Sequence, residues 1–204
     1  MQARILLVEG SDDQHVIWAL RGSRKVSQVF GVQKADGVDK LLESLPVWLK
    51  ASGLEQLAVV LDADTNLDSR WQSVSDILRN SGNGQLPKVP EKNGTLVTLT
   101  TGIQFGIWLM PDNELPGMLE NFVARLVPNS DTMMSHVDRF LGGIPENERQ
   151  FPAPQLPKAR IHSWLAVQES PGKPMGQAIT AAYLTADHDA VALFIQWIDR
   201  ALVK

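Results

Sequence analysis

Short apolar segments alternate with longer amphipathic segments along the first half of the chain. Turn residues bound each apolar segment, which is typical of strands buried on both faces of a sheet. The predicted strands span residues 4–8, 26–33, 57–61, 95–100 and 104–110. Between them, apolar residues recur at helical spacing, as Leu41, Leu45 and Leu49 do. This order predicts an α/β fold with a doubly wound, mainly parallel, Rossmann-like sheet flanked by helices, and a hairpin of the last two strands.

The second half of the chain has a mostly helical pattern. The predicted helices span residues 118–126, 128–143, 158–167 and 187–202, and loops are expected at residues 145–157 and 170–176. Met133, Val137 and Phe140 are expected to face inward. We therefore divide the chain into an α/β core at residues 1–127 and a helical C-terminal extension, residues 128–204, that packs on the core.

The composition is that of an ordinary globular protein. Of 204 residues, 44% are hydrophobic and 21% are charged. No apolar run approaches the ~18 residues of a membrane span, and the N-terminus lacks the layout of a signal peptide. Cysteine is absent, which excludes disulfides, thiolate zinc sites and a cysteine nucleophile. We therefore expect a cytoplasmic protein without membrane association.

The charge balance limits the partners. A net charge of −4 argues against a freestanding nucleic-acid binder, because binding of phosphate is dominated by basic surface. A bound metal ion could supply positive charge locally, so nucleic acid stays a candidate ligand. Trp18, Trp164 and Trp197 follow helical patterns and are expected in the core rather than in base stacking. A homo-oligomer is compatible with the sequence.

Acidic residues follow two of the predicted strands. Glu9 comes directly after the first strand, in LLVEGSDD, and Asp62 and Asp64 follow the third, in VVLDAD. Open α/β sheets bind ligands at the carboxyl ends of their strands, so these carboxylates are expected at such a site. Asp62 and Asp64 are expected to project to the same side, because side chains alternate along a strand. Three acids at one edge favour a hard divalent cation, Mg²⁺ or Mn²⁺.

These motifs resemble the signatures of the Toprim domain, which occurs in topoisomerases, bacterial primases, recombination proteins and OLD-family nucleases. LLVEG is similar to the Glu-Gly signature of the first Toprim strand, and LDAD to the Asp-x-Asp signature of the third. VEGSDD and MPDNELPGMLENF are most similar to small prokaryotic Toprim-related proteins close to the OLD nuclease domain. The resemblance implies a Toprim-like fold over roughly residues 3–110.

The resemblance also implies roles for the acids. Toprim enzymes hold the metal with the Asp pair, here Asp62 and Asp64, and use the Glu, here Glu9, as a general acid or base or as a further ligand. OLD-type nucleases use a second metal, for which the candidates are Asp13, Asp68, Glu114 and, best placed, Glu120. The candidates for contact with phosphate are Lys158 and Lys173.

The secondary candidates also have purely structural interpretations. Asp13 stands in the first turn of a predicted helix, where negative charge is favoured, and Asp68 is placed to cap another. Lys158 and Lys173 are equally typical of an exposed surface. Acids that end buried strands have no comparable structural explanation, so the functional interpretation is favoured for Glu9, Asp62 and Asp64.

Several Toprim activities are excluded by what the chain lacks. A topoisomerase needs a tyrosine nucleophile on a separate large domain, and Tyr183 is the only tyrosine. The zinc modules of primases and recombination mediators are missing. The remaining expectation is a Mg²⁺-dependent, nuclease-like phosphodiester hydrolase. No Walker motif is present, so any ATPase that acts with it would be a separate partner.

Two alternatives stay open, and the sequence does not decide whether the protein is an enzyme. One is a non-catalytic binding or regulatory module that keeps the fold. The other is a hydrolase of a small phosphorylated molecule, with the loop at residues 82–94 as a lid. An open basic cleft would favour a nuclease, a deep pocket a small substrate, and a blocked site a binding module.

Overall fold

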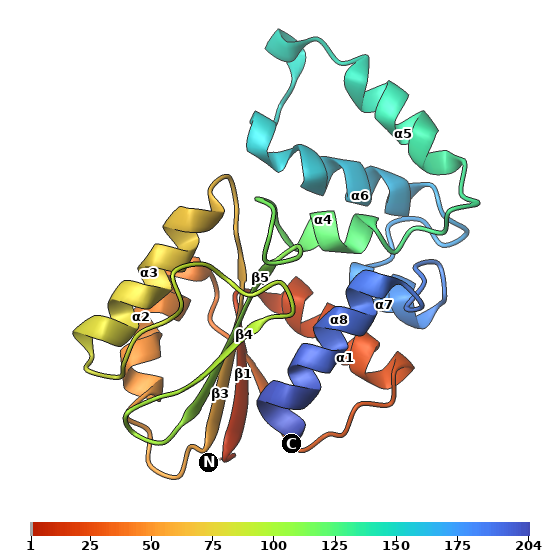
Figure 1. Cartoon of the computed structure of the whole chain (residues 1–204). Helices are drawn as coiled ribbons and strands as arrows, with labels where there is room; N and C mark the ends of the chain where they lie inside the picture. Colours follow the sequence, from red (N-terminus) through yellow and green to blue (C-terminus); the bar gives the residue numbers. More distant parts are fainter. Residues whose placement is uncertain (1) are drawn as a thin grey trace.

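The centre of the molecule is a five-stranded sheet (Figure 1), in a computed structural model that describes residues 2–204. The strands are β1 (Arg4–Val8), β2 (Gly31–Lys34), β3 (Gln56–Asp62), β4 (Thr95–Thr98) and β5 (Gln104–Met110). Their order is β2-β1-β3-β5-β4, and β4 runs antiparallel to its neighbour β5. The expected α/β fold, the mainly parallel sheet and the hairpin are confirmed.

β1 and β3 lie side by side and run parallel, with Val8 opposite Val60. Their residues are buried on both faces, because Ala58 and Val60 belong to one hydrophobic cluster while Leu57 and Val59 belong to the other. Such strands need helices on each side. Because the two strands are parallel, their carboxyl ends lie at the same edge of the sheet, where Glu9 follows β1 and Asp62 ends β3.

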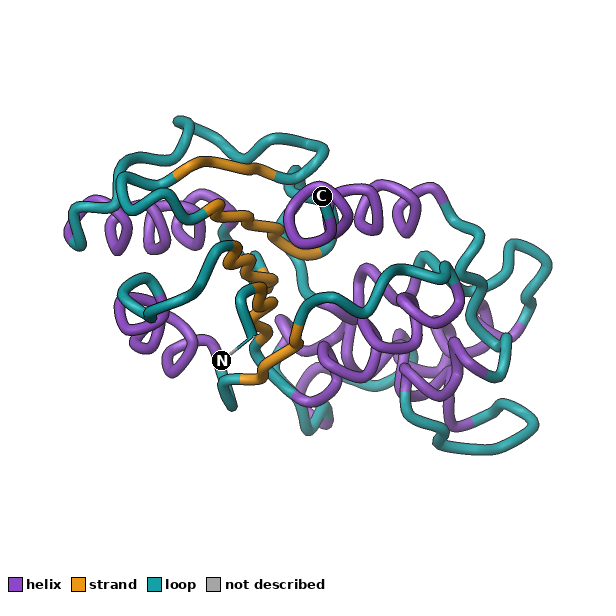
Figure 2. Tube along the Cα trace, turned by 90° about the horizontal axis from the view of Figure 1, so that it is seen from below, coloured by secondary structure: helices purple, strands orange, loops and turns teal. Residues whose placement is uncertain are grey.

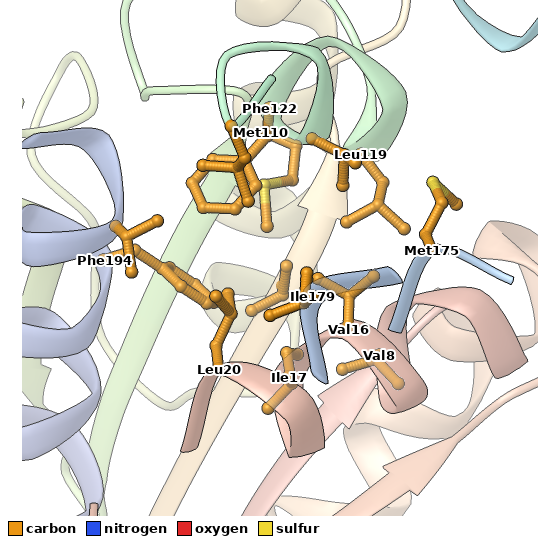
Figure 3. Close-up of a cluster of buried hydrophobic side chains, with 14 of the residues drawn as sticks. Val8, Val16, Ile17, Leu20, Met110, Leu119, Phe122, Met175, Ile179 and Phe194 are labelled. Atoms are coloured by element: carbon orange, nitrogen blue, oxygen red, sulfur yellow. The ribbon is translucent and has the colours of Figure 1, made fainter. Parts of the chain in front are cut away.

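Helices cover both faces of the sheet (Figure 2). One face carries α2 (Val38–Trp48) and α3 (Leu67–Asn80). The other carries α1 (Ser11–Ser23), α7 (Met175–Thr180) and α8 (Asp189–Ile198), which continues as the short π-helix η3 (Asp199–Val203). Figure 3 shows Val16 of α1, Ile179 of α7 and Phe194 of α8 meeting over this face. The C-terminal helices thus build part of the sheet's own core.

The remaining helices form a lobe beyond the carboxyl ends of the strands (Figure 1). They are α4 (Leu119–Ala124), α5 (Met133–Gly142) and α6 (Leu156–Ala166), with the 3₁₀ turns η1 (Glu146–Glu148) and η2 (Ala153–Gln155) between α5 and α6. Val137 of α5 and Trp164 of α6 are buried in the cluster that includes Val8. Arg160 Nε lies 2.6 Å from Asp138 Oδ1 and joins the two helices. Across residues 2–204, the helices are too short or too polar to span a bilayer.

The structure corrects two predicted segments. The second strand begins at Gly31 rather than at residue 26, because residues 27–29 are exposed and only Gly31–Lys34 pairs with β1. Part of the expected loop at residues 170–176 enters the helix α7. At Gly176 a Cβ atom would lie 2.6 Å from the carbonyl oxygen of His15, so this glycine allows close packing of α7 on α1.

Three expectations about buried side chains were wrong. Trp18 is 47% exposed, although Trp164 and Trp197 are buried as expected. On α5, Val137 faces inward, while Met133 and Phe140 are exposed. α5 joins the core through Val137 and Leu141, and the side of the helix with Met133 and Phe140 faces solvent.

Candidate functional site

The acid that follows β1 reaches across to the end of β3. The backbone N–H of Asp62 donates a hydrogen bond of 2.7 Å to Oε1 of Glu9. This bond is possible because β1 and β3 are neighbours in register, so that Glu9 stands level with the last residues of β3. The two motifs of the sequence are thus joined directly by a hydrogen bond.

Asp62 in turn connects the sheet to the helical lobe. Its Oδ1 accepts a hydrogen bond of 2.8 Å from the backbone N–H of Leu119, at the start of α4. A free N–H at the first turn of a helix is a normal partner for a carboxylate. This contact places the next residue, Glu120, beside the ends of β1 and β3.

Two further acids, both buried, join half-buried Glu9 and Asp62. We call these four residues the carboxylate cluster: Glu9, Asp13, Asp62 and Glu120. Asp13 is only 8% exposed and Glu120 only 5%. Asp13 stands in the first turn of α1, where its Oδ2 accepts a hydrogen bond of 3.0 Å from Gly10 N–H. Asp13 can therefore stabilise the start of α1 and belong to the candidate site at the same time.

The cluster is electrostatically unfavourable when all its members are charged. Burial, only partly offset by the hydrogen bond from Asp62, raises the pKa of Glu9 from 4.5 to about 7. Burial likewise raises the pKa of Asp13 from 3.8 to about 6. The pKa of Asp62 is raised well above 3.8 by burial and then by Glu9, Asp13 and Glu120. Protons or a cation must relieve this repulsion.

The cluster opens into a pocket of about 340 Å³. Its lining includes seven carboxylates, those of Glu9, Asp12, Asp13, Asp36, Asp62, Asp64 and Glu120. Lys158 and Gln155, from α6 and the turn before it, also line the pocket. Lys158 Nζ lies 3.5 Å from Oε1 of Glu120. The site thus combines the sheet edge with the helical lobe and is strongly acidic.

Asp64 does not continue the strand as expected, although it lines the same pocket as Asp62. β3 ends at Asp62, and Asp64 lies beyond it in the left-handed region with φ of +53°, so strand alternation no longer applies. Its Oδ2 is 2.5 Å from Nη2 of Arg70 on α3. Asp64 therefore lies at the rim of the acidic pocket and is neutralised by an arginine.

Three of the remaining candidates lie apart from the pocket lining. Asp68 stands in the first turn of α3, but the helix is capped by Asn66, whose Oδ1 accepts a hydrogen bond from Ser69 N–H. Glu114 pairs with Lys92 at 2.9 Å. Lys173 lies over the ring of Tyr183. None of these three residues lines the acidic pocket.

Sequence reasoning missed Arg70 and Gln155. The available signal for Arg70 was a lone basic residue six positions after Asp64, in a helix that follows the Asp-x-Asp motif. Gln155 gave no signal, because it lies in a proline-rich segment without a motif. Its place at the pocket depends on how the helical lobe folds back over the sheet edge.

The donor set fits a hard divalent cation in its chemistry, although it is not preassembled. All the acids present oxygen ligands, which Mg²⁺ prefers. Over residues 2–204, no three carboxylate or imidazole groups already surround a single point as a metal site would. Mg²⁺ is usually held by one or two carboxylates with water and phosphate as its other ligands. A complete protein cage is therefore not required.

The fold has a counterpart among solved structures. A crystal structure of a hypothetical protein, PH0156 from Pyrococcus horikoshii OT3, matches with a TM-score of 0.58 and 15% sequence identity. The match covers 98% of this chain and 95% of that one, and at this identity it supports the fold alone. Among curated proteins, none matches the sequence.

The sequence also matches a family model, described as a protein of unknown function (DUF3226), over residues 3–203. The match includes the sheet, the carboxylate cluster and the helical lobe. Because it extends over nearly the whole chain, the protein belongs to the DUF3226 family.

Proposed function

We propose that this protein is a Mg²⁺-dependent phosphodiester hydrolase of the Toprim type, with a nuclease-like site. The observation that carries the proposal is the carboxylate cluster at the carboxyl ends of β1 and β3, where buried Asp13 and Glu120 lie beside half-buried Glu9 and Asp62. Buried charges of one sign are costly unless a cation accompanies them. Structural acids of this kind would not need a solvent-accessible pocket lined by seven carboxylates.

The residues divide into distinct roles in this proposal. Asp62 and Glu120 would hold the cation, since both belong to the cluster and adjoin each other through Leu119. A bound cation would stabilise the charge on a phosphodiester and lower the pKa of an attacking water. Glu9 keeps its second oxygen available for a proton or a ligand, because the Asp62 N–H occupies only Oε1. Asp13 is the nearest support for a second cation.

Lys158 is the basic residue that we assign to the phosphate. It is half-exposed, lines the pocket and lies close to Glu120, so its ammonium can turn between the cluster and a bound anion. Lys173 is not assigned this role, because it lies on the ring of Tyr183 instead. Without cations, a lining with one lysine and seven carboxylates would repel a phosphodiester.

A separate ATPase partner is part of the proposal. The acidic lining of the pocket supplies no basic path for a long nucleic acid, and such a path would have to come from another protein. A basic partner surface would also be attracted by the acidic pocket.

Hydrolysis of a small phosphorylated molecule is the second candidate function. The favouring observation is the size of the pocket, about 340 Å³, which lies within the range of small-molecule sites and is bounded by α6. A small phosphate ester could enter together with its cation and would need no basic groove.

Hydrolysis assays test the proposal. Wild-type protein with Mg²⁺ or Mn²⁺ should cleave bis(p-nitrophenyl) phosphate, and comparison of an oligonucleotide with mononucleotides would separate the two substrate classes. Asp62→Asn and Glu120→Gln should each reduce the rate at least ~100-fold, because the metal ligands are lost. Asp138→Asn, in an exposed ion pair on α5, is the matched control and should stay active.

Absence of cleavage of all these substrates, with either metal, would contradict the hydrolase and support a non-catalytic module. Equal activity in Asp62→Asn and wild type would also contradict it, because the activity would then come from elsewhere.

A further inference from the structure

We propose that Arg70 is a positioning residue that holds Asp64 outside the carboxylate cluster, and that a bound cation takes Asp64 from it. This inference rests on the metal-dependent function proposed above. It identifies Arg70 as a residue that competes with the cation for the carboxylate of Asp64. It also explains why only the first aspartate of the Asp-x-Asp motif belongs to the carboxylate cluster in this structure.

Arg70 is placed to act on both acids of the motif. Its Nε donates a hydrogen bond of 2.9 Å to the backbone carbonyl of Asp62, and its Nη2 pairs with Oδ2 of Asp64 at 2.5 Å. The Arg70 side chain is 14% exposed, whereas the Asp64 side chain is 47% exposed. The arginine is therefore fixed by two bonds, while its partner carboxylate remains accessible to solvent.

Asp64 borders three hollows. One is the acidic pocket, one of about 530 Å³ lies toward Gly117 and Pro154, and one of about 250 Å³ lies at the start of α3, where Arg70 and Ser73 help to line it. Its backbone is held in the left-handed region, and its N–H donates a hydrogen bond of 2.7 Å to Gly117 O. The backbone of Asp64 is thus fixed between the acidic pocket and the hollow beside Arg70. Rotation of the side chain then decides whether the carboxylate faces the pocket or the arginine.

A divalent cation is the stronger competitor for this carboxylate. A half-exposed ion pair contributes little, because solvent screens it. A cation at the acidic pocket would carry twice the charge of the guanidinium and would bind oxygen directly. Arg70 would keep its bond to Asp62 O after Asp64 turned away, so the exchange would not leave the end of β3 without its anchor.

A double-mutant cycle on metal affinity tests this exchange. Binding of Mn²⁺ is measured by calorimetry for wild type, Arg70→Gln, Asp64→Asn and the double variant. Arg70→Gln should bind Mn²⁺ about tenfold more tightly than wild type, because Asp64 is released. In the Asp64→Asn background, the same arginine substitution should change affinity at most about threefold, the effect of a nearby charge alone.

Two controls keep the result interpretable. Arg79→Gln changes the same charge on the same helix, in an exposed pair with Asp76, and should leave the affinity within about twofold of wild type. Arg70→Lys keeps the charge but not both bonds of the guanidinium. It should give an intermediate gain, and it replaces Arg70→Gln if that variant fails to fold.

An equal gain in the wild-type and Asp64→Asn backgrounds would overturn the inference, since Arg70 would then act only through its charge. The same holds if Arg70→Gln and Arg70→Lys bind Mn²⁺ as wild type does. In both cases the wild type still binds metal, so the proposed function stands. Failure of the wild type and of every variant to bind Mn²⁺, both without and with inorganic phosphate, would overturn both proposals together.

Discussion

At the scale of single residues, two effects act on the acids of the site. Backbone N–H groups stabilise the carboxylates, and the negative charges of neighbouring carboxylates repel one another. Asp62 accepts a hydrogen bond from Leu119 N–H, and Glu9 accepts one from Asp62 N–H. Their shared burial nevertheless raises the pKa of both carboxyls. Such an arrangement lowers stability and is typical of sites where function, not folding, sets the choice of residue.

Asp62→Asn should therefore stabilise the metal-free protein. The asparagine keeps an oxygen that can accept from Leu119 N–H and removes a charge that is repelled by its neighbours. We expect the free energy of unfolding at pH 8 to rise by about 1–3 kcal/mol. Urea denaturation with a chelator present measures this change. Asp138→Asn, at an exposed pair, should lower stability by less than about 1 kcal/mol, and a loss at Asp62 as well would contradict the electrostatic account.

The pH dependence of stability should show the same repulsion. The pKa of Glu9, about 7, and that of Asp13, about 6, lie above their ordinary values of 4.5 and 3.8, so the folded state binds more protons than the unfolded chain. Their stabilising contribution is complete below pH 4 and is lost as pH rises through 6 and 7.

We expect the free energy of unfolding of the metal-free protein to fall by on the order of 2–3 kcal/mol between about pH 5 and 8. Denaturation curves across this range, with a chelator, provide the measurement. Saturating Mg²⁺ should reduce the slope. Stability that is constant or rises over this interval would show that the cluster is not strained.

At the scale of elements, sequence patterns identified the strands better than the details of their ends. The apolar runs predicted β1, β3 and β5 closely, because a strand buried on both faces leaves a continuous apolar signal. The separation of Asp64 from the carboxylate cluster was not predictable. The left-handed backbone of Asp64 is held by a hydrogen bond to Gly117, which lies in a loop distant in the sequence.

The helix α7 was missed for a similar reason. Its six residues carry too little periodicity to stand out, and its glycine and the nearby prolines indicated a loop. Glu120, which the sequence favoured as a supporting acid at the start of a helix, lies in the carboxylate cluster, while its role stays a prediction. Its contact with the cluster depends on the bond between Leu119 and Asp62, which no local pattern reveals.

The packing of α7 on α1 gives a prediction at this scale. Gly176→Ala should destabilise the protein by about 1–3 kcal/mol, because the new Cβ would lie 2.6 Å from the backbone oxygen of His15. Gly142→Ala, at the end of α5, meets no atom within 4 Å and should be neutral or slightly stabilising. Thermal unfolding of both variants checks the difference. Equal effects would mean that α7 does not pack closely on α1.

At the scale of the whole molecule, the site depends on segments that are far apart in the sequence. β1 and β3 supply Glu9 and Asp62 at the sheet edge, and the lobe supplies Glu120 and Lys158. The C-terminal helix α8 packs Phe194 and Trp197 against Trp108 of β5. The helical extension is therefore part of both the core and the pocket, while the division at residue 127 stays a prediction.

In the proposed function, the groups that would hold the cation and its phosphate come from segments far apart in the chain. The proposed function and the proposed exchange of Asp64 between Arg70 and the metal both depend on whether a divalent cation binds there. The most direct test is calorimetry of Mg²⁺ and Mn²⁺ binding to the full chain, with and without inorganic phosphate, for wild type, Asp62→Asn and Asp138→Asn.

We predict that the wild type and Asp138→Asn bind the cation and that Asp62→Asn binds it at least about tenfold more weakly, a loss of about 1.4 kcal/mol. The account would be contradicted if Asp62→Asn bound the cation as tightly as the wild type. It would equally be contradicted if the wild type bound neither cation in the presence of phosphate.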